Sequence, residues 1–166
     1  MSNHFSAGLN HWDLNRDQTR APNRVSLNGR EYLEFPHTGL SKTITLVTSL
    51  PSNWNSRILA VRVYWTSPAT TVGQVSWGLR ARNRPDTDES PVVGTVSYGP
   101  LRSIRDSHSG TPGDLNISVT RSLNFGILPP QTTMIQIELH RNVNDSQDSL
   151  NSVAYLRHVA IEWGRN

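Results

Sequence analysis

Apolar and polar residues alternate with a period of two along most of the chain after residue 30, and this pattern restricts the possible fold more than any other feature. Alternation of this kind places apolar side chains on one face of an extended strand and polar side chains on the other. Val61, Val63 and Trp65 share one face, for example, and Tyr64 takes the other. The segments expected to form strands are 31–35, 40–50, 57–66, 73–82, 92–98, 115–123, 133–141 and 153–163.

Three later segments are assigned a buried apolar face by the same rule. Each pairs three apolar side chains with polar residues at the intervening positions, as expected for a strand with one face against the core. The predicted buried sets are Leu115, Ile117 and Val119, then Ile135, Ile137 and Leu139, then Tyr155, Val159 and Ile161.

No window shows the apolar stripe of an amphipathic helix, and the residues between the strand segments are rich in turn formers. The sequence therefore predicts an all-β protein, an eight-stranded antiparallel jelly-roll-like β-sandwich. An immunoglobulin-type sandwich stays open, but the chain lacks the cysteine pair that marks it.

The first thirty residues differ from the rest, because they contain few apolar residues and no sustained alternation. We expect residues 1–30 to form an irregular N-terminal arm or cover, and residues 31–166 to form the sandwich domain. Asn28-Gly29 is typical of a tight turn and is expected to lead into the first strand.

The chain of 166 residues contains no cysteine, which excludes disulfides, thiolate metal sites and a cysteine nucleophile. It has no apolar run of the length that spans a bilayer, and no secretory signal pattern is visible at its start, so no membrane partner is expected. The formal net charge is +3, and nearly all the basic residues are arginine, with Lys42 as the single lysine. Arginine favours planar contacts with several donors, although biased codon usage explains the excess equally well.

Catalytic and metal-binding patterns are absent from the sequence. The six histidines never occur at metal-ligand spacing, and no nucleotide-binding or hydrolase motif is present. Asp106, Ser107 and His108 carry the letters of a catalytic triad, but three consecutive residues do not assemble one. Residues 142–148 are rich in side-chain oxygens, for which a polar turn is favoured over a cation site. We therefore expect no enzyme activity, no catalytic residue, no cofactor and no metal.

Arg80, Arg82 and Arg84 occupy alternate positions and should project from one face of a strand. Such a stripe could bind phosphates, but the neighbouring Trp65 and Trp77 alternate to the opposite face and cannot provide a stacking platform. The pattern favours a solvated or partner-facing surface, and no nucleic acid is expected as a partner.

Several blocks of the chain resemble a family of small virion proteins of tailed bacteriophages. The departures from the family pattern are Asn142, where Asp is usual, and Ser149, where Thr is common. The blocks that carry the resemblance are residues 1–9, 30–35 and 48–51, Val61-x-Val63-x-Trp65, Gly73-x-Val75-x-Trp77, and residues 137–142, 145–150 and 155–163.

This resemblance implies a jelly-roll sandwich and a non-enzymatic role as a capsid decoration (cement) protein. Such a protein binds at capsomer junctions as a homotrimer, has the major capsid protein as its partner, and lies on the outer surface of a virion made in the bacterial cytoplasm. The arm would then supply an apolar anchor and cations for carboxylates on the capsid or a neighbouring subunit. The predicted partner-binding residues are Trp12, Arg16, Arg20, Arg24, Arg80 and Arg82.

Two alternatives belong to other functional classes. A receptor- or carbohydrate-binding module of a phage tail fibre would use a long loop at 99–114, with Tyr98, Arg102, Arg105 and His108 as its candidate residues. A sugar hydrolase on the same fold would need two carboxylates facing one cleft. The acidic residues of this chain fall mostly in expected turns or on expected outward faces, which disfavours hydrolysis.

Overall fold

A computed structural model describes residues 3–7, 13–14, 19–49, 54–84, 98–123 and 134–165, and these residues form two antiparallel sheets packed face to face. The all-β sandwich predicted from the sequence is confirmed. The strands are β1 (Asn3–Ala7), β2 (Asp13–Leu14), β3 (Asn23–Leu27), β4 (Arg30–Phe35), β5 (Thr43–Ser49), β6 (Trp54–Thr66), β7 (Gly73–Arg84), β8 (Arg102–His108), β9 (Asn116–Leu123), β10 (Met134–Arg141) and β11 (Ala154–Arg165).

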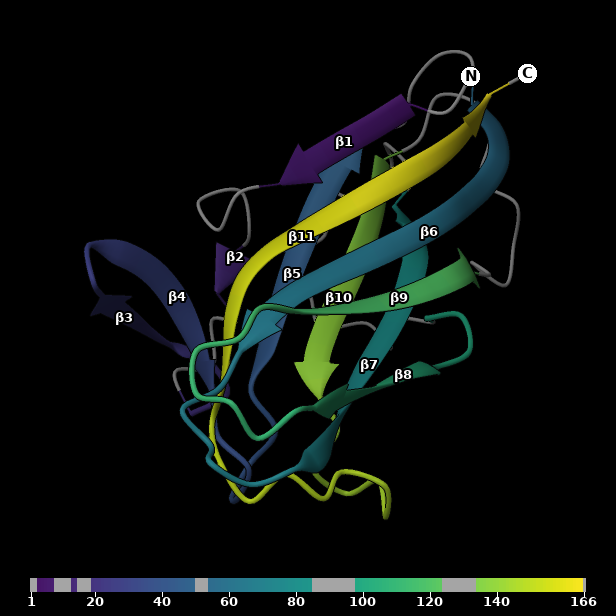
Figure 1. The fold of residues 1–166 in the computed structure, drawn as a ribbon. Helices are drawn as coiled ribbons and strands as arrows, with labels where there is room; N and C mark the ends of the chain where they lie inside the picture. Colours follow the sequence, from purple (N-terminus) through teal and green to yellow (C-terminus); the bar gives the residue numbers. More distant parts are fainter. Residues whose placement is uncertain are drawn as a thin grey trace.

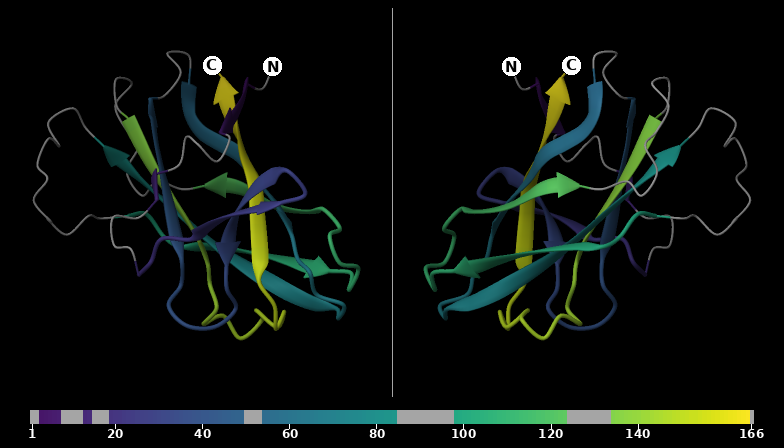
Figure 2. Two further views of the ribbon diagram at one scale, coloured as in Figure 1. Left: turned by 90° about the vertical axis from the view of Figure 1, so that its left-hand side faces the viewer. Right: turned by 90° about the vertical axis from the view of Figure 1, so that its right-hand side faces the viewer.

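The first sheet has the order β3-β4-β11-β6-β9, with β1 paired to the far half of β11, and the second has the order β2-β5-β10-β7-β8. Figure 1 shows the first sheet in front, with β6 and β11 crossing over β5 and β10. Figure 2 shows from two sides that β1 and the end of β11 lie together at one end of the sandwich, and that the β10–β11 connection lies at the other. No helix in the described part of the chain is long and apolar enough to cross a membrane.

The core lies between the sheets and is built from the alternating apolar residues of both. Trp65 of β6 and Trp77 of β7 meet edge to face with ring centroids 6.2 Å apart, and Phe35 packs on Trp77 at 5.3 Å. Edge-to-face packing is a favourable geometry for aromatic pairs. The predicted inward faces of β6, β7 and β10 are confirmed, because Val61, Val63, Trp65, Val75, Trp77, Leu79, Ala81, Ile135, Ile137 and Leu139 are all buried.

The N-terminal thirty residues contribute strands to both sheets, whereas the sequence predicts an irregular arm. β1 pairs with β11, β2 with β5, and β3 with β4. These strands are two to five residues long, too short to give a clear alternation. The predicted turn is confirmed: Asn28 and Gly29 both have positive φ, 52° and 72°, which defines the tight turn between β3 and β4.

Strand β8 is a further correction to the sequence analysis, which places residues 99–114 in one long loop. Arg102–His108 pairs with β7 over its whole length. Its residues alternate, with Ile104 and His108 buried, but the charged and polar residues between them obscure the pattern. The strand predicted at 92–98 lies almost wholly outside the described residues.

Strand β9 is inverted relative to its apolar pattern, so its predicted buried face is wrong. Ser118 points inward and is 1% exposed, whereas Ile117 and Val119 point outward and are 46% and 44% exposed. The Ser118 hydroxyl accepts a hydrogen bond from Trp65 Nε1 (2.8 Å) and donates to Asp106 Oδ2 (3.0 Å). A buried indole N–H needs an acceptor, and meeting that need turns the polar face of β9 to the interior.

Strand β11 contains a bulge that changes which of its residues face the core. The register to β6 shifts between Leu156 and His158, so that Arg157 has no partner across the ladder. Even-numbered residues therefore face the core before the bulge, and odd-numbered residues face it after the bulge. Val159 and Ile161 are buried as predicted, but Tyr155, which the sequence places with them, lies on the outer face and is half-exposed.

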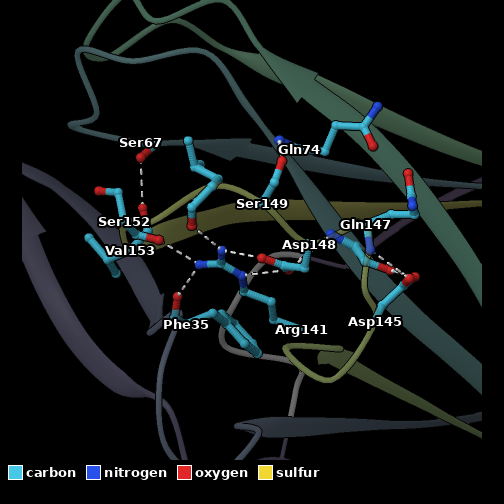
Figure 3. Close-up of polar contacts among 12 residues, drawn as sticks. Phe35, Ser67, Gln74, Arg141, Asp145, Gln147, Asp148, Ser149, Ser152 and Val153 are labelled. Atoms are coloured by element: carbon cyan, nitrogen blue, oxygen red, sulfur yellow. Dashed lines mark hydrogen bonds and ion pairs between the residues drawn. The ribbon is translucent and has the colours of Figure 1, made fainter.

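The β10–β11 connection is fixed by Arg141, whose guanidinium is completely buried (Figure 3). Its Nε and Nη2 donate to the two carboxylate oxygens of Asp148 at 2.9 and 2.6 Å. The other donors reach the backbone carbonyls of Ser152, Leu150 and Phe35 at 2.6, 2.7 and 3.3 Å. The guanidinium thus occupies the centre of the connection and holds it against β4.

The second carboxylate of this connection is also paired. Asp145 accepts from Arg105 Nε (3.0 Å), the Ser76 hydroxyl (2.6 Å) and the backbone N–H of Gln147 (3.0 Å). These hydrogen bonds, that from Arg105 above all, lower the pKa of Asp145 to about 2. The carboxylates of 142–148 therefore bind protein donors, which agrees with the polar turn favoured from the sequence. No group of His, Asp and Glu suited to a metal occurs among the residues described.

Candidate functional site

The outer face of the first sheet carries a row of aromatic rings, which we call the tyrosine face. It comprises Tyr32 of β4, Tyr155 and His158 of β11, and Tyr64 of β6, all half-buried. Tyr155 lies opposite Thr66 and His158 opposite Tyr64, so the rings come from three neighbouring strands. The Tyr32 and Tyr155 centroids are 6.2 Å apart, and those of Tyr64 and His158 are 5.5 Å apart.

A hollow of about 540 Å³ opens beside Tyr32 and Tyr155. Its wall is the β3–β4 hairpin, which contributes Leu27, Asn28 and Arg30, and its other side is formed by residues 66–68 and 112–113. The volume falls in the range of small-molecule sites, and a few polar groups among apolar walls are typical of such sites. We call this the first hollow.

The first hollow contains an unsatisfied polar group. The Thr66 side chain is almost fully buried at its edge, and its hydroxyl has no hydrogen-bond partner among the described residues. A buried hydroxyl without a partner destabilises the folded state by about 1–3 kcal/mol. A neighbouring ligand rich in hydroxyl groups could satisfy it after a small side-chain movement.

A second hollow, of about 380 Å³, lies between β6, β11 and the start of β9. It is lined by Tyr64, Leu115, Arg157 and His158. Burial, and then the positive charge of Arg157, lower the pKa of His158 below its usual value. The imidazole is therefore largely uncharged at neutral pH, and the positive charge at this hollow belongs to Arg157.

The outer face of the second sheet is a different surface, in which charges are paired. Arg80 donates to both oxygens of Glu138, at 2.8 and 2.9 Å, and its guanidinium lies 4.3 Å from the centre of the Tyr98 ring. Gln136 accepts from Arg82 Nε at 2.7 Å and donates to the Tyr98 hydroxyl at 3.0 Å. Burial and then the charge of Glu138 raise the pKa of Tyr98. The two arginines are therefore occupied within the sheet.

The predicted partner-binding residues do not form one surface. Trp12 and Arg16 lie outside the described residues. Arg24 is on β3 of the first sheet, 3.9 Å from Glu31, and the backbone carbonyl of Arg20 accepts from Thr43. Arg80 and Arg82, by contrast, are on β7 of the second sheet. No comparison tests the role of these residues, and it stays a prediction.

The candidate residues of the 99–114 segment are also dispersed, because that segment contains β8. His108 is fully buried, and its Nε2 donates to the carbonyl of Ala69 at 3.0 Å. Arg105 points outward to Asp145, and Tyr98 lies against Arg80. Arg102 is exposed near the start of β8. The sugar site expected at this loop is therefore not assembled there.

Asp106, Ser107 and His108 do not form a triad. Asp106 accepts from Trp65 Nε1 and from Ser118, His108 is bonded to Ala69, and Ser107 alternates to the opposite face of β8. The interpretation of these residues as structural agrees with their contacts.

Sequence analysis missed the tyrosine face as a site. The outward position of Tyr64 follows from alternation, but Tyr155 is shifted by the bulge. Tyr32 lies in a short strand between exposed Glu31 and buried Leu33, and nothing in the sequence indicates that it contacts Tyr155. The one local signal in the sequence is the Asn28-Gly29 pair, whose positive φ angles form the β3–β4 turn that lines the first hollow.

Comparisons with known proteins find similarity at the level of structure. No family model and no curated protein matches this chain. A family 11 carbohydrate-binding module from Clostridium thermocellum, solved with a β-1,3-1,4-mixed-linked tetrasaccharide, is 11% identical, with a TM-score of 0.45 over 96% of this chain and 87% of that one. A carbohydrate-binding module specific for non-crystalline cellulose is 10% identical, with a TM-score of 0.45 over 91% of this chain and 84% of that one.

Likenesses of this size do not decide the ligand of this chain, which has to be argued from its own surface. The comparisons also leave untested the resemblance to phage virion proteins, so that the virion location and the capsid partner stay predictions.

Proposed function

We propose that this protein is a carbohydrate-binding module whose site is the tyrosine face. The observation that carries the proposal is the row of half-exposed rings on three adjacent strands, flanked by two hollows. Adjacent strands are about 4.8 Å apart, which is close to the length of one sugar ring. A saccharide chain lying across β4, β11 and β6 could therefore place successive rings near successive strands.

The chemistry of this face suits sugars. The axial C–H groups of a pyranose form an apolar patch that packs on an aromatic ring, while its hydroxyls need donors and acceptors at the rim. Here Tyr32, Tyr155 and Tyr64 supply rings, and Asn28 and Arg30 supply exposed polar groups beside the first hollow. A largely preformed site of this kind loses little side-chain entropy when it binds.

The described linings of the two hollows lack the groups that hydrolyse a glycosidic bond. That reaction generally requires two carboxyl groups that flank the bond. No aspartate or glutamate lines either hollow among the residues described. The proposal is therefore binding without turnover.

A glycan array followed by titration calorimetry tests the proposal on the full chain. A stacking contact on one ring contributes about 0.5–1.5 kcal/mol, so Tyr155→Ala should weaken binding of an array hit by roughly two- to tenfold. Tyr98→Ala, on the outer face of the second sheet, is the matched control and should leave binding unchanged. Circular dichroism confirms that each variant is folded.

Two results reject this assignment. Absence of binding to every neutral and acidic glycan on the array rejects the function. Loss of binding in Tyr98→Ala with retention in Tyr155→Ala moves the site to the second sheet.

A second candidate, the capsid decoration protein, is favoured by the outer face of β9. This strand is the last of its sheet and presents Ile117 and Val119 to solvent at 46% and 44% exposure, and Leu115, just before it, is 49% exposed. Exposed apolar edge strands promote association, and a homotrimer could bury this one.

Light scattering on chromatographed protein tests this second candidate, with Ile117→Lys as the variant. A trimer that Ile117→Lys converts to monomer supports it. A monomer at every concentration for the unmodified chain argues against it.

A further inference from the structure

Both hollows of the tyrosine face contain an arginine without an acidic partner. Arg30 lines the first hollow and Arg157 the second, and both side chains are exposed. Neither makes an ion pair within the described part of the chain, and no carboxylate lines either hollow there. Four other described arginines do have acidic partners, in the pairs Arg62–Glu162 (3.0 Å), Arg80–Glu138 (2.8 Å), Arg105–Asp145 (3.0 Å) and Arg141–Asp148 (2.6 Å).

Local backbone geometry places each of the two arginines. Arg30 directly follows the Asn28-Gly29 turn and lies two residues before Tyr32, on the same face of β4. Arg157 is the bulge residue of β11, left outside the ladder to β6. A bulge commonly redirects a side chain at the cost of local pairing, and here it adds a cation beside Tyr64 and His158.

We infer that the ligand of the tyrosine face is an acidic polysaccharide, one that carries uronate carboxylates or sulfate esters. This inference rests on the proposed carbohydrate-binding function and specifies its ligand. The planar guanidinium donates two parallel hydrogen bonds to a carboxylate or sulfate. One arginine at each end of the ring row could bind anionic groups on two separated sugar units while the tyrosines pack on the rings between them.

Single-stranded nucleic acid also combines negative charge with rings that stack, but the tyrosine face fits it less well. Binding of that kind uses a continuous positive groove along the backbone. On this face the carboxylates of Glu34 and Glu162 lie between and beside the rings, with Glu34 accepting from Asn23 and Glu162 from Arg62. Two separated cations with carboxylates near them do not form such a continuous positive groove.

Matched polysaccharide pairs test the inference on the full chain. The first pair is polygalacturonate and its fully methyl-esterified form, and the second is chondroitin sulfate and unsulfated chondroitin; polyuridylate is the nucleic-acid probe. We expect at least tenfold tighter binding to one acidic member than to its less charged counterpart, with affinity falling as salt rises. The pair that shows the preference identifies carboxylate or sulfate as the anionic group.

Variants then locate the charge recognition. Arg30→Gln and Arg157→Gln should each weaken binding to the acidic polymer severalfold or more, and each should reduce the ratio of affinities between the acidic polymer and its less charged counterpart. Arg102→Gln removes an exposed arginine of the second sheet and is the matched control, which should bind as the unmodified chain does.

The outcomes separate this inference from the function on which it rests. Equal affinity for the two members within both pairs overturns the inference and leaves the carbohydrate-binding function standing. Absence of binding to all glycans rejects both. Tighter binding to polyuridylate than to either acidic polysaccharide overturns the inference in favour of nucleic acid.

Discussion

Replacing Arg141 is expected to destabilise this protein more than replacing any exposed arginine. Its guanidinium is buried, pairs with the buried carboxylate of Asp148, and donates to three backbone carbonyls. Arg141→Met leaves that carboxylate buried without a cation, a change that typically destabilises by about 3–5 kcal/mol. The carbonyls of Leu150 and Ser152 lose their donors as well, at about 1–3 kcal/mol each if water does not reach them.

These contributions overlap, because removal of one side chain lets the connection relax and admit water. We therefore expect a loss of at least about 4 kcal/mol, against a total stability of about 5–15 kcal/mol for an ordinary domain. With a urea dependence of about 2 kcal/mol per molar, the unfolding midpoint should fall by about 2 M. Arg141→Lys keeps the charge but loses the five planar donors of the guanidinium. Its urea midpoint should therefore lie between those of the unmodified protein and Arg141→Met.

Urea unfolding followed by tryptophan fluorescence measures the effect, because Trp65 and Trp77 lie in the core. Arg105→Ala is the matched control: it removes an ion pair whose arginine side chain is half exposed, and should shift stability by less than about 1 kcal/mol. An Arg141→Met variant within about 1 kcal/mol of the unmodified protein would refute the reasoning. If Arg141→Met does not fold, the urea midpoint of Arg141→Lys still tests whether Arg141 stabilises the protein.

Three further predictions concern single contacts. Thr66→Val should raise the free energy of unfolding by about 1 kcal/mol, since it removes a buried hydroxyl without a partner among the described residues; a lower urea midpoint contradicts this. Gly78→Ala should destabilise by about 1–3 kcal/mol because its methyl group meets the His140 ring, and thermal unfolding should show the loss relieved in a His140→Ala background. The pKa of Asp145 is about 2 in the folded protein, below its unfolded value of 3.8. Its pairing with Arg105 therefore stabilises the folded state fully above about pH 4, and this stabilisation is lost as the pH falls from about 4 to 2. Asp145→Asn should therefore approach the unmodified protein in urea midpoint across that interval, and a constant difference would argue against the pairing.

The two faces of β7 and of residues 135–139 in β10 could be predicted from the sequence because a single rule governs them. Their inward residues are apolar and their outward residues are mostly polar, as Leu79 and Arg80 show. Pairing partners could not be predicted, since alternation gives the faces of a strand and not its neighbours. The hydrogen bonds of Arg141 could not be predicted from the sequence either. Its guanidinium donates to oxygens of β4 and of the β10–β11 connection, and alternation says nothing about contacts between such separate segments.

The first sheet departs from that rule at β9 and at β11, the second of which carries part of the tyrosine face. Strand β9 turns its apolar residues outward, and β11 shifts Tyr155 to the outer face and exposes Arg157 at its bulge. Alternation assumes that burial in the core decides every orientation. A surface that binds a partner must instead expose rings and apolar groups, at some loss of stability. At β11 the residues for which the alternating pattern and the structure disagree therefore lie on the face proposed to bind, as Tyr155 and Arg157 show.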